Sequence, residues 1–109
     1  MIRDMQPRHD RILLLAQALT YQNRLRPSAH SRQREGDRAI EFADAEATIL
    51  SQDAQVTGEN PHHPEGTTYT IAGMRFDGDT MHVVVAFNDE NAEDATELRI
   101  VTMMYPEER

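Results

Sequence analysis

Hydrophobic side chains in the first part of the chain recur at the spacing of an α-helix. Across residues 9–25 they fall three or four positions apart, which gathers them on one helical face. Arg26-Pro27 ends this helix, because a residue before proline is driven out of the helical conformation. We therefore predict an amphipathic helix here, packed on the rest of the domain or on a second copy of the chain.

Two further helices are predicted before the middle of the chain. Ser28 is a good N-cap, so a second helix begins at Ala29, although Gly36 is expected to interrupt it. A third helix covers residues 42–50, where early acidic side chains favour the positive end of the helix dipole. The N-terminal half should thus contain three helices.

The hydrophobic period changes to that of strands in the second half. Three segments rich in β-branched and aromatic residues lie between turn signals, at 67–76, 81–87 and 97–105. Asp77-Gly78 suits a hairpin turn, residues 57–67 have the composition of a loop, and 53–56 is a short additional strand. The prediction is an α+β fold with N-terminal helices packed on a small three- to four-stranded antiparallel sheet, 81–87 being central.

The composition fits one small globular domain over residues 1–109. Of these residues 39% are hydrophobic and 28% charged, which is sufficient for a single core. No apolar segment approaches the roughly 20 residues that span a bilayer, and the polar N-terminus lacks a signal-peptide pattern. With no cysteine present, these features predict a cytoplasmic protein without membrane contact.

Charge is unevenly distributed along the chain. Residues 1–38 contain eight arginines and four acids, a net charge of +4, whereas residues 39–109 contain three arginines and fifteen acids, a net charge of −12. Every basic residue is arginine, whose planar guanidinium can form paired hydrogen bonds with phosphate or carboxylate. Codon bias in a GC-rich genome is the simpler explanation, so arginine content alone assigns no ligand.

Candidate chemistry begins with His30, Arg34 and Arg38, which are four residues apart. On a continuous helix this spacing aligns their side chains along one stripe. An imidazole can transfer protons near neutral pH, and guanidinium groups can stabilise charge on a phosphate transition state. The same spacing is also typical of a solvated helix face, so both interpretations stay open.

His82 interrupts the apolar run of the predicted central strand. Alternation divides this strand into two faces: Met81, Val83, Val85 and Phe87 against His82, Val84 and Ala86. The first face is the better core, so His82 should point to a partly covered surface, in a structural or a chemical role. Thr102 and Tyr105 offer hydroxyls, but their opposite parity prevents both from facing His82 without a bulge.

Motifs for other chemistries are missing. The chain has no glycine-rich phosphate loop, no nucleophile elbow and no zinc motif. His62-His63 near Glu65 offers nitrogen and oxygen ligands, but this spacing fits no known metal motif. We expect neither a metal nor a cofactor.

The candidate residues occur in an order that resembles a known family, the domain of unknown function family numbered 4258. The pattern is carried by Ser28, His30, Arg34, Arg38, Ile40 and Asp44 in SAHSRQREGDRAIEFAD, by His82 in MHVVVAF, and by Thr102, Tyr105 and Pro106 in IVTMMYP. It covers residues 28–106 with nearly all spacings kept. This chain departs by one extra residue before Tyr105 and by Ala39, where the family has glycine.

The resemblance implies both a fold and an activity. The family is similar to toxin-like ribonucleases of the barnase, colicin E5 and RelE group, which pack helices on a small antiparallel sheet and cut RNA without a metal. It would make His30 and His82 proton-transfer groups. Arg34 and Arg38 would hold the phosphate, and Thr102 and Tyr105 would provide supporting hydroxyls. Residues 1–26 would be an added helix outside the match.

The net charge of −8 conflicts with RNA binding, because proteins that grip RNA gain most of their affinity from cationic surface. Three functions therefore stay open. They are a metal-independent ribonuclease acting on RNA, an inactive acidic protein that inhibits a basic nucleic-acid-binding partner, and an assembly module that forms a homodimer through its first helix. Arginines and His82 lining one cleft would favour the enzyme, whereas a cleft coated with acids would favour the acidic binder.

Overall fold

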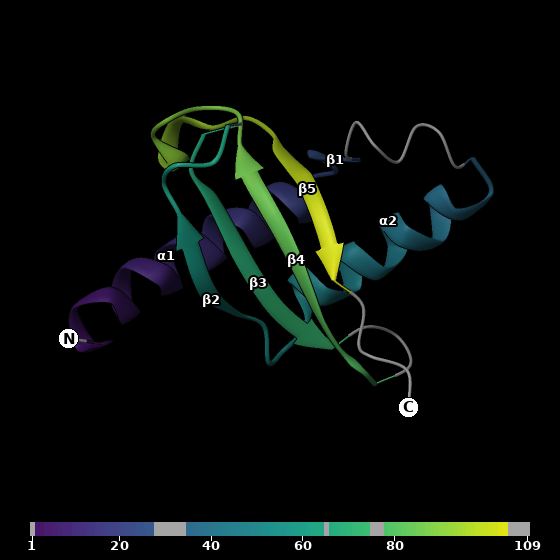
Figure 1. Cartoon of the computed structure of the whole chain (residues 1–109), viewed down its shortest axis with the longest axis horizontal. Coiled ribbons are helices and arrows are strands. Elements are labelled where there is room, and N and C mark those ends of the chain that lie inside the picture. Colours follow the sequence, from purple (N-terminus) through teal and green to yellow (C-terminus); the bar gives the residue numbers. More distant parts are fainter. Residues whose placement is uncertain (1, 28–34, 65, 75–77, 105–109) are drawn as a thin grey trace.

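The computed structural model describes residues 2–27, 35–64, 66–74 and 78–104, without the side chains of 2–6 and 35–41. These residues form an α+β fold (Figure 1). Its elements are α1 (Ile2–Tyr21), β1 (Leu25–Arg26), α2 (Glu35–Leu50), β2 (Gln55–Asn60), β3 (Thr68–Met74), β4 (Thr80–Phe87), the 3₁₀ helix η2 (Ala92–Asp94) and β5 (Leu98–Met104). Neither described α-helix is long and apolar enough to cross a membrane.

The sheet has five strands in the order β1-β5-β4-β3-β2. Strands β2 to β5 form the predicted antiparallel meander, with β4 in the centre. The predicted number of three to four strands is wrong, because β1 adds a parallel edge to β5 through Leu25 and Arg26. A strand of two residues is too short to produce a periodic hydrophobic pattern, so β1 could not be predicted from periodicity.

Strand β2 extends over residues 57–60, which were predicted to belong to a loop. It pairs with β3 from Gln55 to Asn60, with an irregularity in register between Val56 and Gly58. A Cβ atom added to Gly58 would lie 3.7 Å from Thr70 Oγ1, an ordinary contact, so the glycine is not required by close packing. β-Bulges are frequent at sheet edges, and strand pairing uses backbone groups that glycine also has. Loop-like composition therefore does not exclude an edge strand.

Helix boundaries also differ from the prediction. The described residues contain two α-helices rather than three, and residues 28–34, where the second helix was expected to begin, lie outside them. Helix α2 runs through Gly36, because glycine costs little in a first turn whose backbone amides have no partner within the helix. Helix α1 ends at Tyr21, before Arg26-Pro27, since Asn23 has a φ of 63° that a helix cannot continue.

Both α-helices pack on the same face of the sheet. Figure 1 shows them together behind the strands. The buried cluster consists of Ile12, Ala16, Leu25, Ala45, Ile49, Tyr69, Ile71, Met81, Val83, Val85, Leu98 and Ile100. Met81, Val83 and Val85 are completely buried, which confirms the predicted core face of β4. The opposite face of the sheet is left without a helix among the described residues.

Gly73 sets the distance between α2 and β3. A Cβ atom at this position would overlap the backbone carbonyl oxygen of Thr48 and lie 3.2 Å from Ser51 Cβ. Thr48 is itself fully buried, and its hydroxyl donates to the Asp44 carbonyl at 2.7 Å. The last turn of α2 thus rests directly on the backbone of β3.

A prediction for α1 compares two of its apolar residues. Ile12 is 7% exposed in the core, whereas Leu14 is 59% exposed. We expect Ile12→Ala to lower the free energy of unfolding by about 2–5 kcal/mol and Leu14→Ala by less than about 0.5 kcal/mol. Urea denaturation of both variants measures this, and equal losses would contradict the packing of α1 on the sheet.

A second prediction concerns Gly73. Gly73→Ala should destabilise the protein by about 1–3 kcal/mol, because α2 must move away from β3 to admit a methyl group. Gly58→Ala is the matched control, since its methyl group meets only ordinary contacts. Thermal unfolding of the two variants distinguishes close packing from a general intolerance of alanine in this sheet.

Candidate functional site

The sheet face opposite the helices is the candidate functional surface, called the open face below. Residues paired across neighbouring strands project from the same face, so the register defines its members. They are Arg26, Gln55, Gly58, Asn60, Thr68, Thr70, Ala72, Met74, Thr80, His82, Val84, Ala86, Arg99, Thr102 and Met104. Figure 1 looks onto this face.

The open face carries no acidic side chain among the described strand residues, although the chain has a net charge of −8. Its ionisable groups there are Arg26, His82 and Arg99. Glu59 is the one acid within the described strands, and it pairs with Tyr69 on the helix-covered side. The open face is therefore a local exception in an acidic protein.

Helix α1 holds the Glu59 carboxylate on the opposite side of the sheet. The Arg8 guanidinium donates to both carboxylate oxygens, with Nη2 to Oε2 at 2.9 Å, and His9 Nε2 lies 3.3 Å from Oε1. These bonds from Arg8, and secondarily from His9, hold the pKa of Glu59 below its ordinary value despite burial. The pKa of neighbouring Tyr69 is raised, mainly by burial and then by the Glu59 charge.

His82 occupies the predicted face of β4. It is half-buried and lies opposite Ala72 on β3 and Met104 on β5. Thr102 is exposed and pairs with Val84, which is two residues after His82 on β4. The Thr102 hydroxyl therefore shares the open face with the His82 imidazole. The pairing of β5 with β4 is irregular opposite Val84 and Val85 of β4. The sequence had instead suggested a bulge near residues 103–104 of β5.

The other predicted residues are not brought beside His82 by the described part of the chain. His30, Arg34 and Tyr105 lie outside the described residues. Arg38 lies in α2, but its side chain is also outside the description. Of the six predicted site residues, the structure thus brings together His82 and Thr102.

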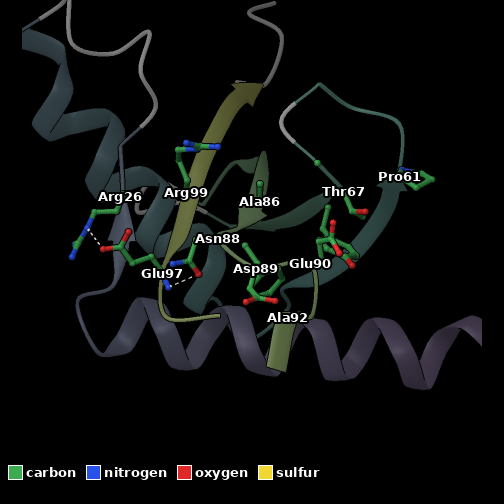
Figure 2. A pocket seen from close by; sticks show the side chains of 13 residues that line it. Arg26, Pro61, Thr67, Ala86, Asn88, Asp89, Glu90, Ala92, Glu97 and Arg99 are labelled. Atoms are coloured by element: carbon green, nitrogen blue, oxygen red, sulfur yellow. Dashed lines mark hydrogen bonds and ion pairs between the residues drawn. The ribbon is translucent and has the colours of Figure 1, made fainter. Parts of the chain in front are cut away.

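A groove of about 640 Å³ lies where β4 ends and its following loop begins. Ala86, Arg26 and Arg99 line it together with acidic loop residues, as Figure 2 shows. Sequence reasoning missed both arginines. They meet only because β1 pairs with β5, and β1 had no detectable pattern.

A protein-family model described as Domain of unknown function (DUF4258) matches residues 28–105. The chain belongs to this family. The DUF4258 segment contains α2 and strands β2 to β5, whereas α1 and β1 precede it. Neither a curated protein nor a solved structure gives a significant match.

Most of the open face lies within the DUF4258 segment, but the preceding residues complete its surroundings. Arg26 adds a second arginine to the groove, and α1 supplies Ile12 and Ala16 to the core. Arg8 from α1 also holds Glu59 on the helix side. The N-terminal addition therefore contributes to both stability and charge distribution.

The Arg8–Glu59 contact predicts a pH-dependent contribution to stability. Because the pKa of Glu59 is lower when folded, the stabilisation is complete above its ordinary value near 4.5 and is lost as pH falls through the lowered value. We expect Glu59→Gln to lower the melting temperature at pH 7, with the difference from wild type shrinking below about pH 4.

Glu90→Gln is the control for this titration, since Glu90 is exposed in the β4–β5 loop. Its effect on melting temperature should be small across the same pH range. A Glu59→Gln deficit that stays constant down to pH 2 would contradict an electrostatic origin.

Proposed function

We propose that the open face binds RNA and that this protein is a toxin-like, metal-independent ribonuclease-type domain. The observation that carries the proposal is the absence of acidic side chains from the described strand residues of a face with His82 on its central strand. Carboxylates repel the phosphate backbone, so a surface that approaches RNA must exclude or neutralise them. The described strand residues of this face meet that requirement despite the net charge, whereas Asp89, Glu90 and Glu97 line the groove where β4 ends.

The proposed reaction is attack of a ribose 2′-hydroxyl on the adjacent phosphorus. One group takes the 2′-hydroxyl proton, the 2′-oxygen bonds to phosphorus, and the P–O5′ bond breaks as a second group protonates the leaving oxygen. The products are a 2′,3′-cyclic phosphate and a 5′-hydroxyl. No electron donor or metal is needed for this transfer.

His82 is our candidate for one proton-transfer group, because its imidazole is half-buried on the open face. Thr102 shares that face and can donate a hydrogen bond to a non-bridging phosphate oxygen. His30 is proposed as the second proton-transfer group, on the family pattern alone. By the same pattern, Arg34, Arg38 and Tyr105 would contact the phosphate.

A second candidate function is favoured by the loop between β4 and β5. Its acids are Asp89, Glu90, Glu93, Asp94 and Glu97. All but Glu97 are exposed. A compact acidic surface suits a basic protein partner, so an inactive relative that inhibits a nucleic-acid-binding protein is the alternative.

The test is cleavage of mixed-sequence RNA with a chelator present. We expect cleavage to fall by at least about 100-fold in His82→Ala, the scale of one lost proton-transfer group. His62→Ala is the matched control, because His62 is an exposed loop residue outside the open face. It should retain wild-type activity.

Two outcomes would reject parts of this proposal. Wild-type protein that cleaves no RNA between pH 5 and pH 9 would reject the ribonuclease and favour the acidic binder. Cleavage that persists unchanged in folded His82→Ala would reject the assignment of His82.

A further inference from the structure

Helix α1 carries a second apolar stripe on the side that faces away from the sheet. Leu14 is 59% exposed and Tyr21 is 82% exposed, and Ala18 between them is exposed as well. They lie on the opposite side of the helix from Ile12 and Ala16, which are buried in the core. Packing within the described part of one copy therefore leaves this stripe in water.

The stripe has the spacing of a coiled-coil seam. With Arg11, which is also exposed, it consists of four residues that are separated by three, four and three positions, called the outer stripe below: Arg11, Leu14, Ala18 and Tyr21. This alternation is the one by which two helices pack side by side along their length. The outer stripe therefore suits a second helix.

The end of α2 extends the apolar surface beside α1. Leu50 is 41% exposed and is the last residue of α2. It follows Ile49, whose carbonyl oxygen accepts a hydrogen bond from Gln17 of α1 at 3.0 Å. A partner that covers the outer stripe can thus also contact the point where the two helices meet.

The outer stripe lacks net charge in a protein in which 28% of the residues are charged. Residues 12–23 contain no charged side chain. Arg11 forms an ion pair with Glu93 of η2, with Nη2 2.7 Å from Oε1, so its charge is neutralised within the chain and its methylene stem remains for apolar contact. Two molecules with a net charge of −8 repel one another, and this surface lets them approach without facing carboxylates.

Two copies of the outer stripe complement each other when the helices are antiparallel. A two-fold axis midway between Leu14 and Ala18 places Leu14 of each copy against Ala18 of the other, so a large side chain meets a small one. The same axis places Tyr21 against the stem of Arg11. Each contact then occurs twice, as a symmetric interface requires.

The ends of the outer stripe carry opposite charges. Asp10 precedes it and Arg24 follows it, and both residues are exposed. In an antiparallel pair, Asp10 of each copy lies toward Arg24 of the other, whereas parallel pairing would bring like charges together. Charge therefore favours a second copy in the antiparallel direction.

We propose that this chain forms a homodimer in which the outer stripes of two α1 helices pack antiparallel. The interface is independent of the proposed function. Because α1 lies behind the sheet in Figure 1, on the side away from the open face, the dimer leaves both open faces uncovered. Each copy can therefore still bind a ligand on that face.

Analytical ultracentrifugation of the purified protein, without RNA, measures this association. We expect the wild type to sediment as a dimer at about 100 µM, a concentration at which a small interface associates. Leu14→Glu should raise the Kd of the dimer at least about tenfold, because it places an unpaired carboxylate between the helices.

Gln55→Glu is the matched control, since it adds the same charge to an exposed residue of the open face. It should change the dimer Kd less than about twofold. Urea denaturation at a concentration well below the dimer Kd checks the fold. Leu14→Glu should there keep the wild-type midpoint, because Leu14 is exposed in a single copy.

A charge exchange tests the antiparallel direction. Arg24→Asp should raise the dimer Kd about threefold, because it places an acid opposite Asp10 of the second copy. Asp10→Arg should also raise Kd, although it makes the protein less negative. Combining the two substitutions should restore the wild-type Kd, since opposite charges face each other again.

The outcomes separate the dimer from the enzyme. Wild-type protein that stays monomeric would overturn the interface and leave the outer stripe to a different protein. A dimer that persists in Leu14→Glu, or an equal loss in Gln55→Glu, would overturn its assignment to α1, and a combined charge exchange without recovery would overturn the antiparallel direction. A dimer that depends on Leu14 in a protein without RNA cleavage would support the interface and reject the ribonuclease.

Discussion

Packing of both helices on one side of the sheet is the constraint on which the rest of this structure depends. Gly73 lets α2 rest on the backbone of β3, and Ile12 brings α1 onto the same side. Alternation along each strand then divides the residues into a helix-covered set and an open-face set, although Thr68 and Ala86 of the open face are also buried. His82 is on the open side because Met81 and Val83 are needed for the core. The candidate site is thus a direct consequence of where the helices pack.

The uneven charge along the sequence has an internal explanation. Three ion pairs join the basic N-terminal part to the acidic C-terminal part: Arg8–Glu59, Arg11–Glu93 and Arg26–Glu97. These arginines neutralise the protein's own carboxylates. The positive charge of residues 1–38 is therefore not wholly available to RNA, since Arg8 is bound to Glu59 on the helix side and Arg26 to Glu97 at the groove.

Sequence patterns were informative where local periodicity decides structure. They predicted the core face of β4 and the side of His82, because alternation is a property of a single strand. They failed for β1 and for the pairing of Arg26 with Arg99, which depends on contact between residues distant along the chain. They also misjudged β2, whose glycine-containing edge pairs through backbone groups. The face of β4 that carries His82 was therefore predictable, and the groove with Arg26 and Arg99 was not.

An acidic protein can present a surface suited to RNA when its acids are far enough from the reacting phosphate. Asn88, which begins the acidic loop, is six residues beyond His82, and a strand of that length spans about 20 Å. At physiological ionic strength the Debye length is about 8 Å, so the loop charges are largely screened at His82. Asp89, Glu90 and Glu97 of this loop instead line the groove where β4 ends. Net charge is therefore a weaker guide to this open face than the position of each carboxylate along the sheet.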